Sequence, residues 1–103
     1  MTAGSREEAE RVVDAAIRGR AAACAQITGP ITSTYWWRGE VQRDEEYLIL
    51  LKTAQDRLDD LVRLVREVHS YETPEIVAVP IVGGLADYLD WVTAETREPK
   101  PAE

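Results

Sequence analysis

The sequence predicts an α+β domain, and three patterns along the chain indicate it. Apolar residues recur at the spacing of an amphipathic helix within residues 5–18 and again within residues 54–69. Between these stretches, residues 31–37 alternate in the manner of a strand. After them, residues 76–82 form a continuous apolar run, which is typical of a strand buried on both faces.

The first helix is predicted to begin after Ser5. Residues 5–8 form a capping box, in which Ser5 can accept a hydrogen bond from the backbone amide of Glu8 while the Glu8 side chain reaches back. Gly19 is predicted to end the helix, because glycine tolerates the backbone conformation that follows a last turn.

A long β-hairpin is predicted to follow. Residues 21–27 are small and apolar and begin a strand, which residues 29–30 (Gly-Pro) interrupt with a bend or bulge. Residues 38–39 (Arg-Gly) form a tight turn, so residues 31–37 are expected to pair with residues 41–53.

The second helix is predicted to close near His69, and a short third helix is predicted over residues 85–96. The resulting order is helix, strand, strand, helix, strand, helix. One further strand in front would give βαββαβ, the ferredoxin-like split-βαβ arrangement. We expect a single domain over residues 1–97 and a loose tail over residues 98–103.

Composition narrows the classes of partner. Acidic residues outnumber basic ones by 19 to 12, which gives a net charge of −7 and disfavours nucleic acid. No apolar run reaches the roughly 20 residues of a membrane helix, and the N-terminus lacks the layout of a signal peptide. The single cysteine, Cys24, excludes an intrachain disulfide. We expect a cytoplasmic protein without nucleic-acid or membrane partners.

Five short segments, in this order, resemble the CutA family of divalent-cation-tolerance proteins. They are residues 22–25 (AACA), 32–40 (TSTYWWRGE), 51–53 (LKT), 69–76 (HSYETPEI) and 87–91 (DYLDW). Each is weak alone, but together they make a specific match over most of the chain. The resemblance implies a ferredoxin-like fold and a compact homotrimer in which strands extend across subunit boundaries. It also implies tolerance of copper and other divalent metals. We expect no enzymatic activity, and copper or another divalent cation as a ligand that folding does not require.

The resemblance also implies a strand before the first helix, of which residues 1–4 match only the end. That strand would lie centrally in the sheet, between residues 76–82 and residues 47–52. Without it, backbone groups on two apolar strands would be unpaired, at about 1–3 kcal/mol for each buried group. We therefore expect the natural chain to start upstream of Met1, or pairing with another chain to fill the gap.

His69, the only histidine, is the first candidate metal ligand, because a neutral imidazole binds copper and zinc well. The family's two further ligand positions fall at Val68 and Met1 in this sequence. The residues alone favour another role, in which His69 caps the end of the second helix. Glu75 is a weaker candidate ligand. It lies at the base of the predicted buried strand, where its charge needs a partner such as Lys52.

The remaining candidates are structural or interface residues. Cys24, in the small apolar strand, is predicted to be a buried packing thiol. Aromatic residues with a polar end suit cores and subunit interfaces, and we expect this role rather than a ligand-stacking cleft for a set of six. They are Tyr35, Trp36, Trp37, Tyr71, Tyr88 and Trp91.

Three classes of function remain open. The leading hypothesis is a trimeric, copper-responsive, non-catalytic protein of cation tolerance. The alternative is a regulatory trimer like the PII signalling proteins, which the family's trimer resembles, with a small ligand in the clefts between subunits. The least favoured is an enzyme that uses His69 and Glu75 as a proton-transfer pair, which requires the two within hydrogen-bond reach.

Overall fold

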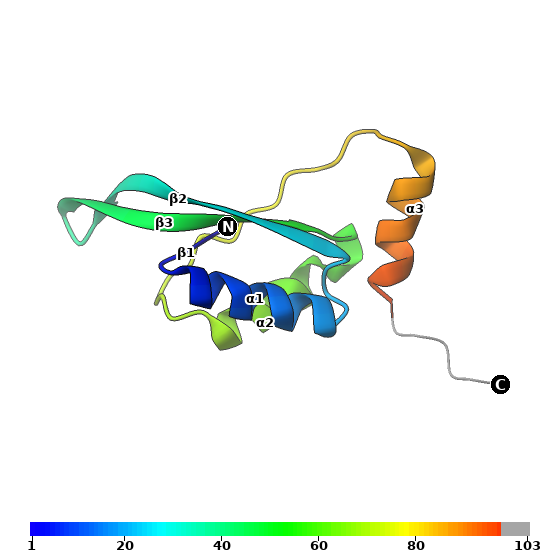
Figure 1. The fold of residues 1–103 in the computed structure, drawn as a ribbon, viewed down its shortest axis with the longest axis horizontal. Coiled ribbons are helices and arrows are strands. Elements are labelled where there is room, and N and C mark those ends of the chain that lie inside the picture. The colour runs from blue at the N-terminus through cyan, green and yellow to red at the C-terminus, as the bar shows by residue number, and fades with distance from the viewer. Residues whose placement is uncertain (98–103) are drawn as a thin grey trace.

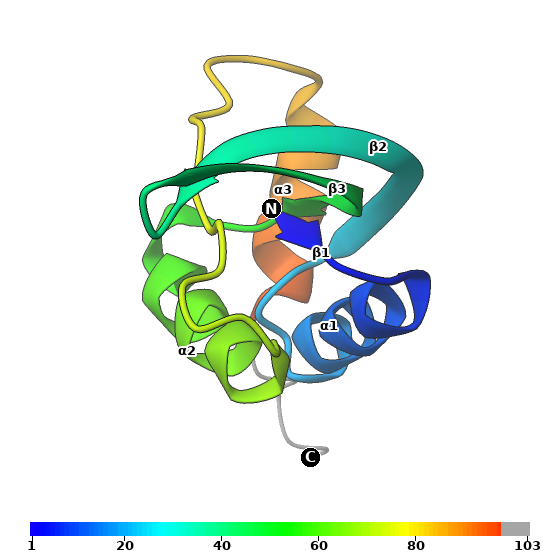
Figure 2. The ribbon, with the colours of Figure 1, turned by 90° about the vertical axis from the view of Figure 1, so that its left-hand side faces the viewer.

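The computed structural model describes residues 1–97, and it places two helices against one face of a three-stranded antiparallel sheet (Figure 1). The sheet order is β1-β3-β2, and α1 and α2 lie side by side beneath it (Figure 2). The elements in chain order are β1 (Thr2–Ala3), α1 (Arg6–Arg18), β2 (Cys24–Trp37), β3 (Glu40–Lys52), the 3-10 helix η1 (Gln55–Arg57), α2 (Leu58–Val68) and α3 (Ala86–Glu95). The α+β class is as predicted.

The β2–β3 hairpin projects well beyond the helices (Figure 1). Its turn has positive φ at both Arg38 (52°) and Gly39 (80°), a backbone that matches the twist of the two strands. The bond between Gly29 and Pro30 is cis, and the strand pairing is interrupted by a bulge between Thr28 and Ile31. The predicted hairpin, its turn and its interruption are therefore confirmed.

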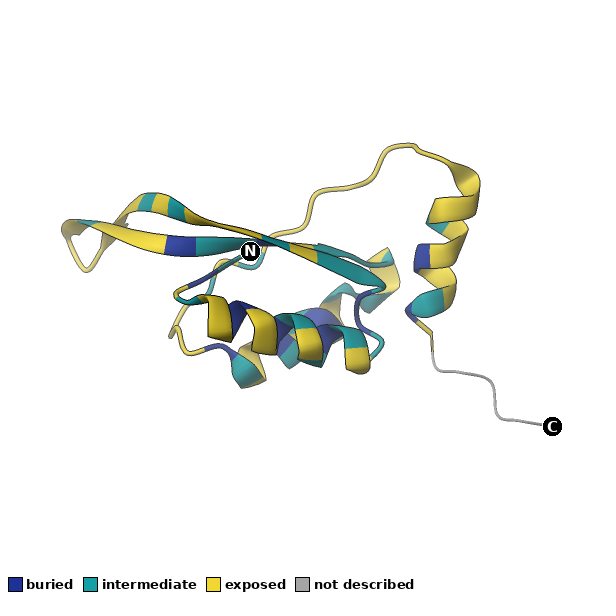
Figure 3. Cartoon of the chain, in the orientation of Figure 1, coloured by how far each residue is buried: buried dark blue, intermediate teal, exposed yellow. Residues whose placement is uncertain are grey.

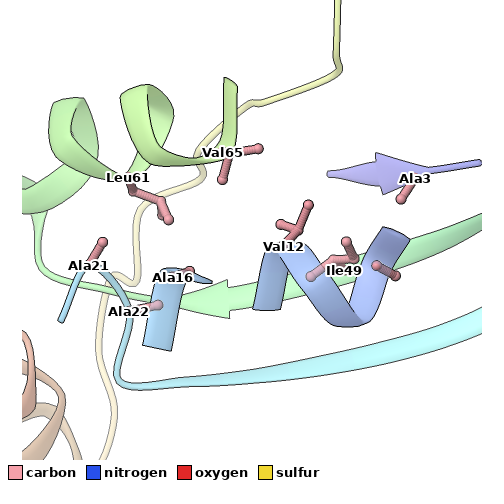
Figure 4. Packing of buried hydrophobic residues seen from close by; sticks show 9 residues of the cluster. Ala3, Val12, Ala16, Ala21, Ala22, Ile49, Leu61 and Val65 are labelled. Carbon is pink, nitrogen blue, oxygen red and sulfur yellow. The ribbon is translucent and has the colours of Figure 1, made fainter. Parts of the chain in front are cut away.

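The hydrophobic core lies between the sheet and the two helices. Nine buried side chains from α1, α2, β1, β3 and the turn after α1 point toward one another (Figure 4). They are Ala3, Ala9, Val12, Ala16, Ala21, Ala22, Ile49, Leu61 and Val65. Five of them are alanines, so α1 packs close to the sheet, and the larger side chains of Val12, Ile49, Leu61 and Val65 fill the space that remains.

The structure contradicts the prediction of a buried strand at residues 76–82. In the described part of the chain this segment pairs with no strand, and it runs as an exposed coil from α2 towards α3 (Figure 3). Val79 is 84% exposed and Val82 is 96% exposed. A strand needs a neighbour, and β1 offers only two residues, both of which pair with β3.

Helix α3 stands beyond the end of the hairpin at which β2 begins (Figure 1). Polar contacts link it to the rest of the domain: Arg20 Nη1 donates a hydrogen bond to Glu95 Oε2 at 2.7 Å, and Cys24 Sγ lies 3.3 Å from the Tyr88 hydroxyl. The predicted tail, residues 98–103, lies outside the described residues. Over residues 1–97, no helix is long and apolar enough to cross a membrane.

Candidate functional site

The buried polar cluster at the end of α2 is centred on His69, which is the C-cap residue of that helix. Its Nδ1 accepts a hydrogen bond from the backbone N–H of Tyr71 at 3.1 Å, and its Nε2 lies 2.8 Å from the carbonyl oxygen of Thr2. An amide only donates and a carbonyl only accepts, so these partners fix the neutral tautomer with the proton on Nε2. Both ring nitrogens are thus engaged.

Glu8 supplies the carboxylate of the cluster. Ser70 donates twice to it, from its backbone N–H to Oε1 at 2.6 Å and from its hydroxyl to Oε2 at 3.0 Å. Burial of Glu8 raises the pKa of its carboxyl, but the two hydrogen bonds from Ser70, with smaller contributions from the basic side chains of His69 and Arg11, outweigh burial, and the pKa falls below the ordinary value. The buried carboxylate is therefore held in its charged form.

Tyr71 connects this cluster to the hairpin. Its hydroxyl donates to Oε2 of the buried Glu46 at 2.9 Å, and its ring packs edge-on against His69 at 4.7 Å between centroids. Burial and the hydrogen bond to Glu46 both raise the pKa of Tyr71, which therefore stays protonated and able to donate. Near the hairpin tip, Arg38 Nη2 donates to Glu72 Oε2 at 3.2 Å. The loop after α2 is thus tied along the underside of the hairpin.

Glu75 does not take the position predicted for it. It is exposed, and among the described residues no hydrogen bond or ion pair joins it to Lys52. Lys52 Nζ instead donates to Gln26 Oε1 across the hairpin. The expected pairing was tied to a buried strand at residues 76–82, and that strand is not formed. Within residues 1–97, no group of three or more histidine, cysteine, aspartate or glutamate side chains is arranged to hold a metal ion.

Apart from Tyr71, the predicted aromatic residues lie at the end of β2 next to the hairpin turn or on α3. Trp36, at the hairpin tip, is 74% exposed, and the guanidinium of Arg38 lies 5.4 Å from the ring centroid of Trp37. On α3, the rings of Tyr88 and Trp91 are 5.8 Å apart. Tyr35, Trp37, Tyr71, Tyr88 and Trp91 are all partly exposed, and their interface role stays a prediction. Cys24 is half-buried, where a buried thiol was expected, and its only side-chain hydrogen-bond partner within residues 1–97 is the exposed hydroxyl of Tyr88.

Sequence reasoning missed the two buried carboxylates, Glu8 and Glu46. Glu8 carried a signal, since it lies one helical turn before Val12 and two before Ala16 and so shares their buried face. It was instead interpreted as half of a capping box, of which the structure shows one part: Ser5 Oγ accepts from the Glu8 amide at 3.1 Å. Glu46 gave no such signal, because it stands in a run of three acidic residues, 44–46.

Comparisons with known proteins agree with this architecture. The chain matches the family model of the CutA1 divalent ion tolerance protein over residues 1–95. The divalent-cation tolerance protein CutA of Thermus thermophilus is 42% identical over 96 residues, which are 93% of this chain and 93% of that protein. The chloroplastic protein CutA 1 of Oryza sativa subsp. japonica is 41% identical over 95% of this chain and 55% of that protein. This chain spans about half the length of the two plant relatives.

Solved structures extend the likeness to the fold. The Cut A1 structure from Thermus thermophilus superposes with a TM-score of 0.91 at 42% identity, and the match covers 93% of both chains. A CutA structure from Archaeoglobus fulgidus gives a TM-score of 0.90 at 38% identity, again over 93% of both chains. The ferredoxin-like fold predicted from the sequence is that of these relatives.

The predicted cytoplasmic location is wrong as a general assignment for such a chain. The rice and Arabidopsis thaliana relatives are named chloroplastic, and the Archaeoglobus fulgidus structure is described as a periplasmic divalent cation tolerance protein. Relatives with this fold are named for different compartments, so the composition of the domain does not indicate its location.

Family membership follows from the extent of these matches. The family model covers almost all of the described residues, and the Thermus thermophilus relative matches along nearly its whole length. The names of these relatives describe tolerance of divalent cations and state no reaction. The chain belongs to the CutA1 family of divalent ion tolerance proteins.

Proposed function

We propose that this chain forms a non-catalytic homotrimer that acts in divalent-cation tolerance by binding copper or another divalent cation. The observation that carries the proposal is the family match over residues 1–95 together with the divalent-cation tolerance for which the relatives are named. Two features of the single chain support the assembly and the ligand chemistry, respectively.

The assembly is supported by two segments that lack partners within the described chain. β2 is an edge strand of the sheet, and residues 77–82 are apolar and exposed, while Ile76 before them packs against the core. An open edge and an exposed apolar segment are complementary, because a strand added to the edge satisfies backbone groups of both. If residues 76–82 of each copy pair with β2 of the next, the contact is heterologous, and three such contacts close a ring.

The ligand chemistry is supported by exposed carboxylates in the loop after α2. Glu75 is exposed, and Glu72 in the same loop is held by an exposed ion pair with Arg38. Carboxylate oxygens bind divalent cations, and an excess of acidic residues raises the local cation concentration. A trimer presents three such loops, so Glu75 is the residue that we assign to the metal.

Calorimetric titration with copper(II) and zinc(II), combined with light scattering, tests both parts of the proposal. We expect a particle mass three times the 11.6 kDa of one chain and heat of binding that falls strongly in Glu75→Gln. Glu67→Gln is the matched control, because Glu67 is an exposed carboxylate on α2. Equal affinity in Glu75→Gln and Glu67→Gln would remove Glu75 from the proposal, and a monomeric mass would overturn the trimer.

A small-ligand regulator like the PII proteins is the second candidate, and one hollow favours it. A surface hollow of about 410 Å³ lies between the end of α1 and α3, and two of its lining side chains are Arg18 and Arg20. Arg18 is paired with Asp14, and Arg20 is paired with Glu95, which also lines the hollow, so a small anion would bind here by displacing these carboxylates from the guanidinium groups. Titration with citrate as the probe should give binding that Arg18→Ala weakens. Absence of binding to the trimer would exclude this candidate in favour of the first.

A further inference from the structure

We infer that His69 is a positioning residue, fixed as the neutral Nε2–H tautomer, which fastens β1 to the loop after α2 and does not ligate metal in the folded chain. This inference goes beyond the proposed function, and it departs from the ligand role that the sequence suggests for His69.

The hydrogen bond that each ring nitrogen of His69 makes determines whether that nitrogen is free to bind a metal. A metal-binding histidine commonly uses one nitrogen on the metal and donates the other to a carbonyl or carboxylate. The Nε2–H of His69 makes such a bond, to the Thr2 carbonyl at 2.8 Å. Nδ1 is therefore the nitrogen that would have to bind the metal, and its lone pair accepts the Tyr71 amide at 3.1 Å.

The surroundings of Nδ1 leave no approach to it. The His69 side chain is fully buried, and the ring of Tyr71 packs against it at 4.7 Å. Glu8 Oε1 lies 3.4 Å from Nδ1, but both oxygens of that carboxylate accept hydrogen bonds from Ser70. A metal at Nδ1 would displace the Tyr71 amide and leave a partly buried donor without its acceptor, which is unfavourable.

Val68 and Met1, which stand at the family's two further ligand positions, also make structural contacts. Val68 is half-buried against the hydrophobic core. The N-terminal amino group of Met1 donates to the carbonyl of Ile49 at 2.9 Å, and the Ile49 amide donates to the Met1 carbonyl at 2.7 Å. β1 is thus held on one side by β3 and on the other by His69. A strand of two residues has few bonds of its own, so the bond from His69 is a large part of what fixes it.

The first test reads the tautomer directly, because the chain contains a single histidine. Long-range ¹H–¹⁵N correlation spectra of the ¹⁵N-labelled protein should show one protonated ring nitrogen, Nε2, and an unprotonated Nδ1. Addition of one equivalent of zinc chloride should leave both ring nitrogen shifts unchanged. A protonated Nδ1 in the neutral ring, or a shift of either nitrogen with zinc, would overturn the inference.

The second test uses two variants, each of which keeps one of the two hydrogen bonds of the His69 ring and removes the other. In His69→Asn the side-chain amide oxygen would lie near the place of Nδ1, so this variant keeps an acceptor for the Tyr71 amide. In His69→Gln the side-chain amide nitrogen would lie near the place of Nε2, so this variant keeps a donor for the Thr2 carbonyl.

The effect of each variant is measured by hydrogen exchange at the backbone amides of Ile49 and Tyr71. In His69→Asn we expect exchange at the Ile49 amide to accelerate about tenfold while the Tyr71 amide stays protected. In His69→Gln we expect the reverse. Equal acceleration at both amides in both variants would show that His69 only fills space and would contradict the inference. If neither variant folds, the ring-nitrogen spectra of the natural sequence test the tautomer and the absence of metal binding.

Discussion

Glu8 and Ser70 lie 62 residues apart in the chain and meet through two hydrogen bonds, from the Ser70 amide to Oε1 and from its hydroxyl to Oε2. This contact joins the first turn of α1 to the residue after the C-cap of α2. It also places a charged carboxylate in a buried site, where only fully satisfied hydrogen bonds make the charge tolerable. The stability of the helix layer therefore depends on an interaction that helix propensity does not describe.

Glu8→Gln should lower the free energy of unfolding by about 2 kcal/mol, because two charge-assisted bonds are replaced by weaker neutral ones, of which the bond to the Ser70 hydroxyl must reverse its direction. Urea unfolding followed by circular dichroism at fixed protein concentration measures the change. Glu7→Gln is the matched control, since Glu7 is the neighbouring carboxylate of the same helix and is exposed. Equal unfolding midpoints for the two variants would show that the Glu8–Ser70 contact contributes nothing specific.

The same carboxylate should make stability depend on pH with a defined sign. The pKa of Glu8 in the folded chain is lowered from 4.5, because the hydrogen bonds from Ser70 outweigh the effect of burial. The folded state then binds fewer protons than the unfolded state, so the contribution is fully present above pH 4.5 and is lost as the pH falls below it through the folded pKa. The difference in unfolding free energy between the natural sequence and Glu8→Gln should therefore be constant above pH 4.5 and shrink below it. A difference that grows on acidification would reverse the sign and contradict the assignment.

Tyr71→Phe should destabilise the protein by about 1–3 kcal/mol, because it removes the hydroxyl that donates to the buried carboxylate of Glu46. Tyr35→Phe is the control, since the Tyr35 hydroxyl also donates to a carboxylate, Asp44 at 2.6 Å, but at an exposed site. Differential scanning calorimetry of both variants gives the comparison. We expect the unfolding temperature of the Tyr35 variant to stay close to that of the natural sequence, because solvent replaces the lost partner at an exposed site.

Much of the fold could be predicted from the sequence because local patterns determine it. The hairpin turn at Arg38 and Gly39 and the interruption at Pro30 each depend on residues next to one another in the chain. Residues 76–82 show the limit of that reasoning. Their apolar run indicates a buried strand, but a strand exists only if a partner edge of adequate length lies beside it, and the run itself contains no information about that partner.

The site was less predictable for the same reason. His69 stands out by its rarity and its place at a helix end; it is the C-cap residue of α2, but its ring bonds the Thr2 carbonyl and the Tyr71 amide rather than the carbonyls of the helix. The partners that determine its chemistry, Thr2, Glu8 and Tyr71, come from three separate elements. Which nitrogen of an imidazole is occupied depends on tertiary distances of a few ångströms, and no spacing along the chain records them.

Ile49 and Leu50 are neighbours on β3 that face opposite sides of the sheet, so substitutions at the two positions should separate folding from assembly. Ile49 is 1% exposed in the core, and Ile49→Ala should cost about 2–5 kcal/mol and lower the unfolding midpoint. Leu50 is 51% exposed on the face that α1 and α2 do not cover. If the homotrimer buries that face, Leu50→Asp should retain the circular dichroism spectrum of the folded chain while light scattering shows the mass fall towards that of one copy. A Leu50→Asp protein that keeps the mass of three copies would place the interface away from the outer face of the sheet, and the exposed edge of β2 would then be the surface to test next.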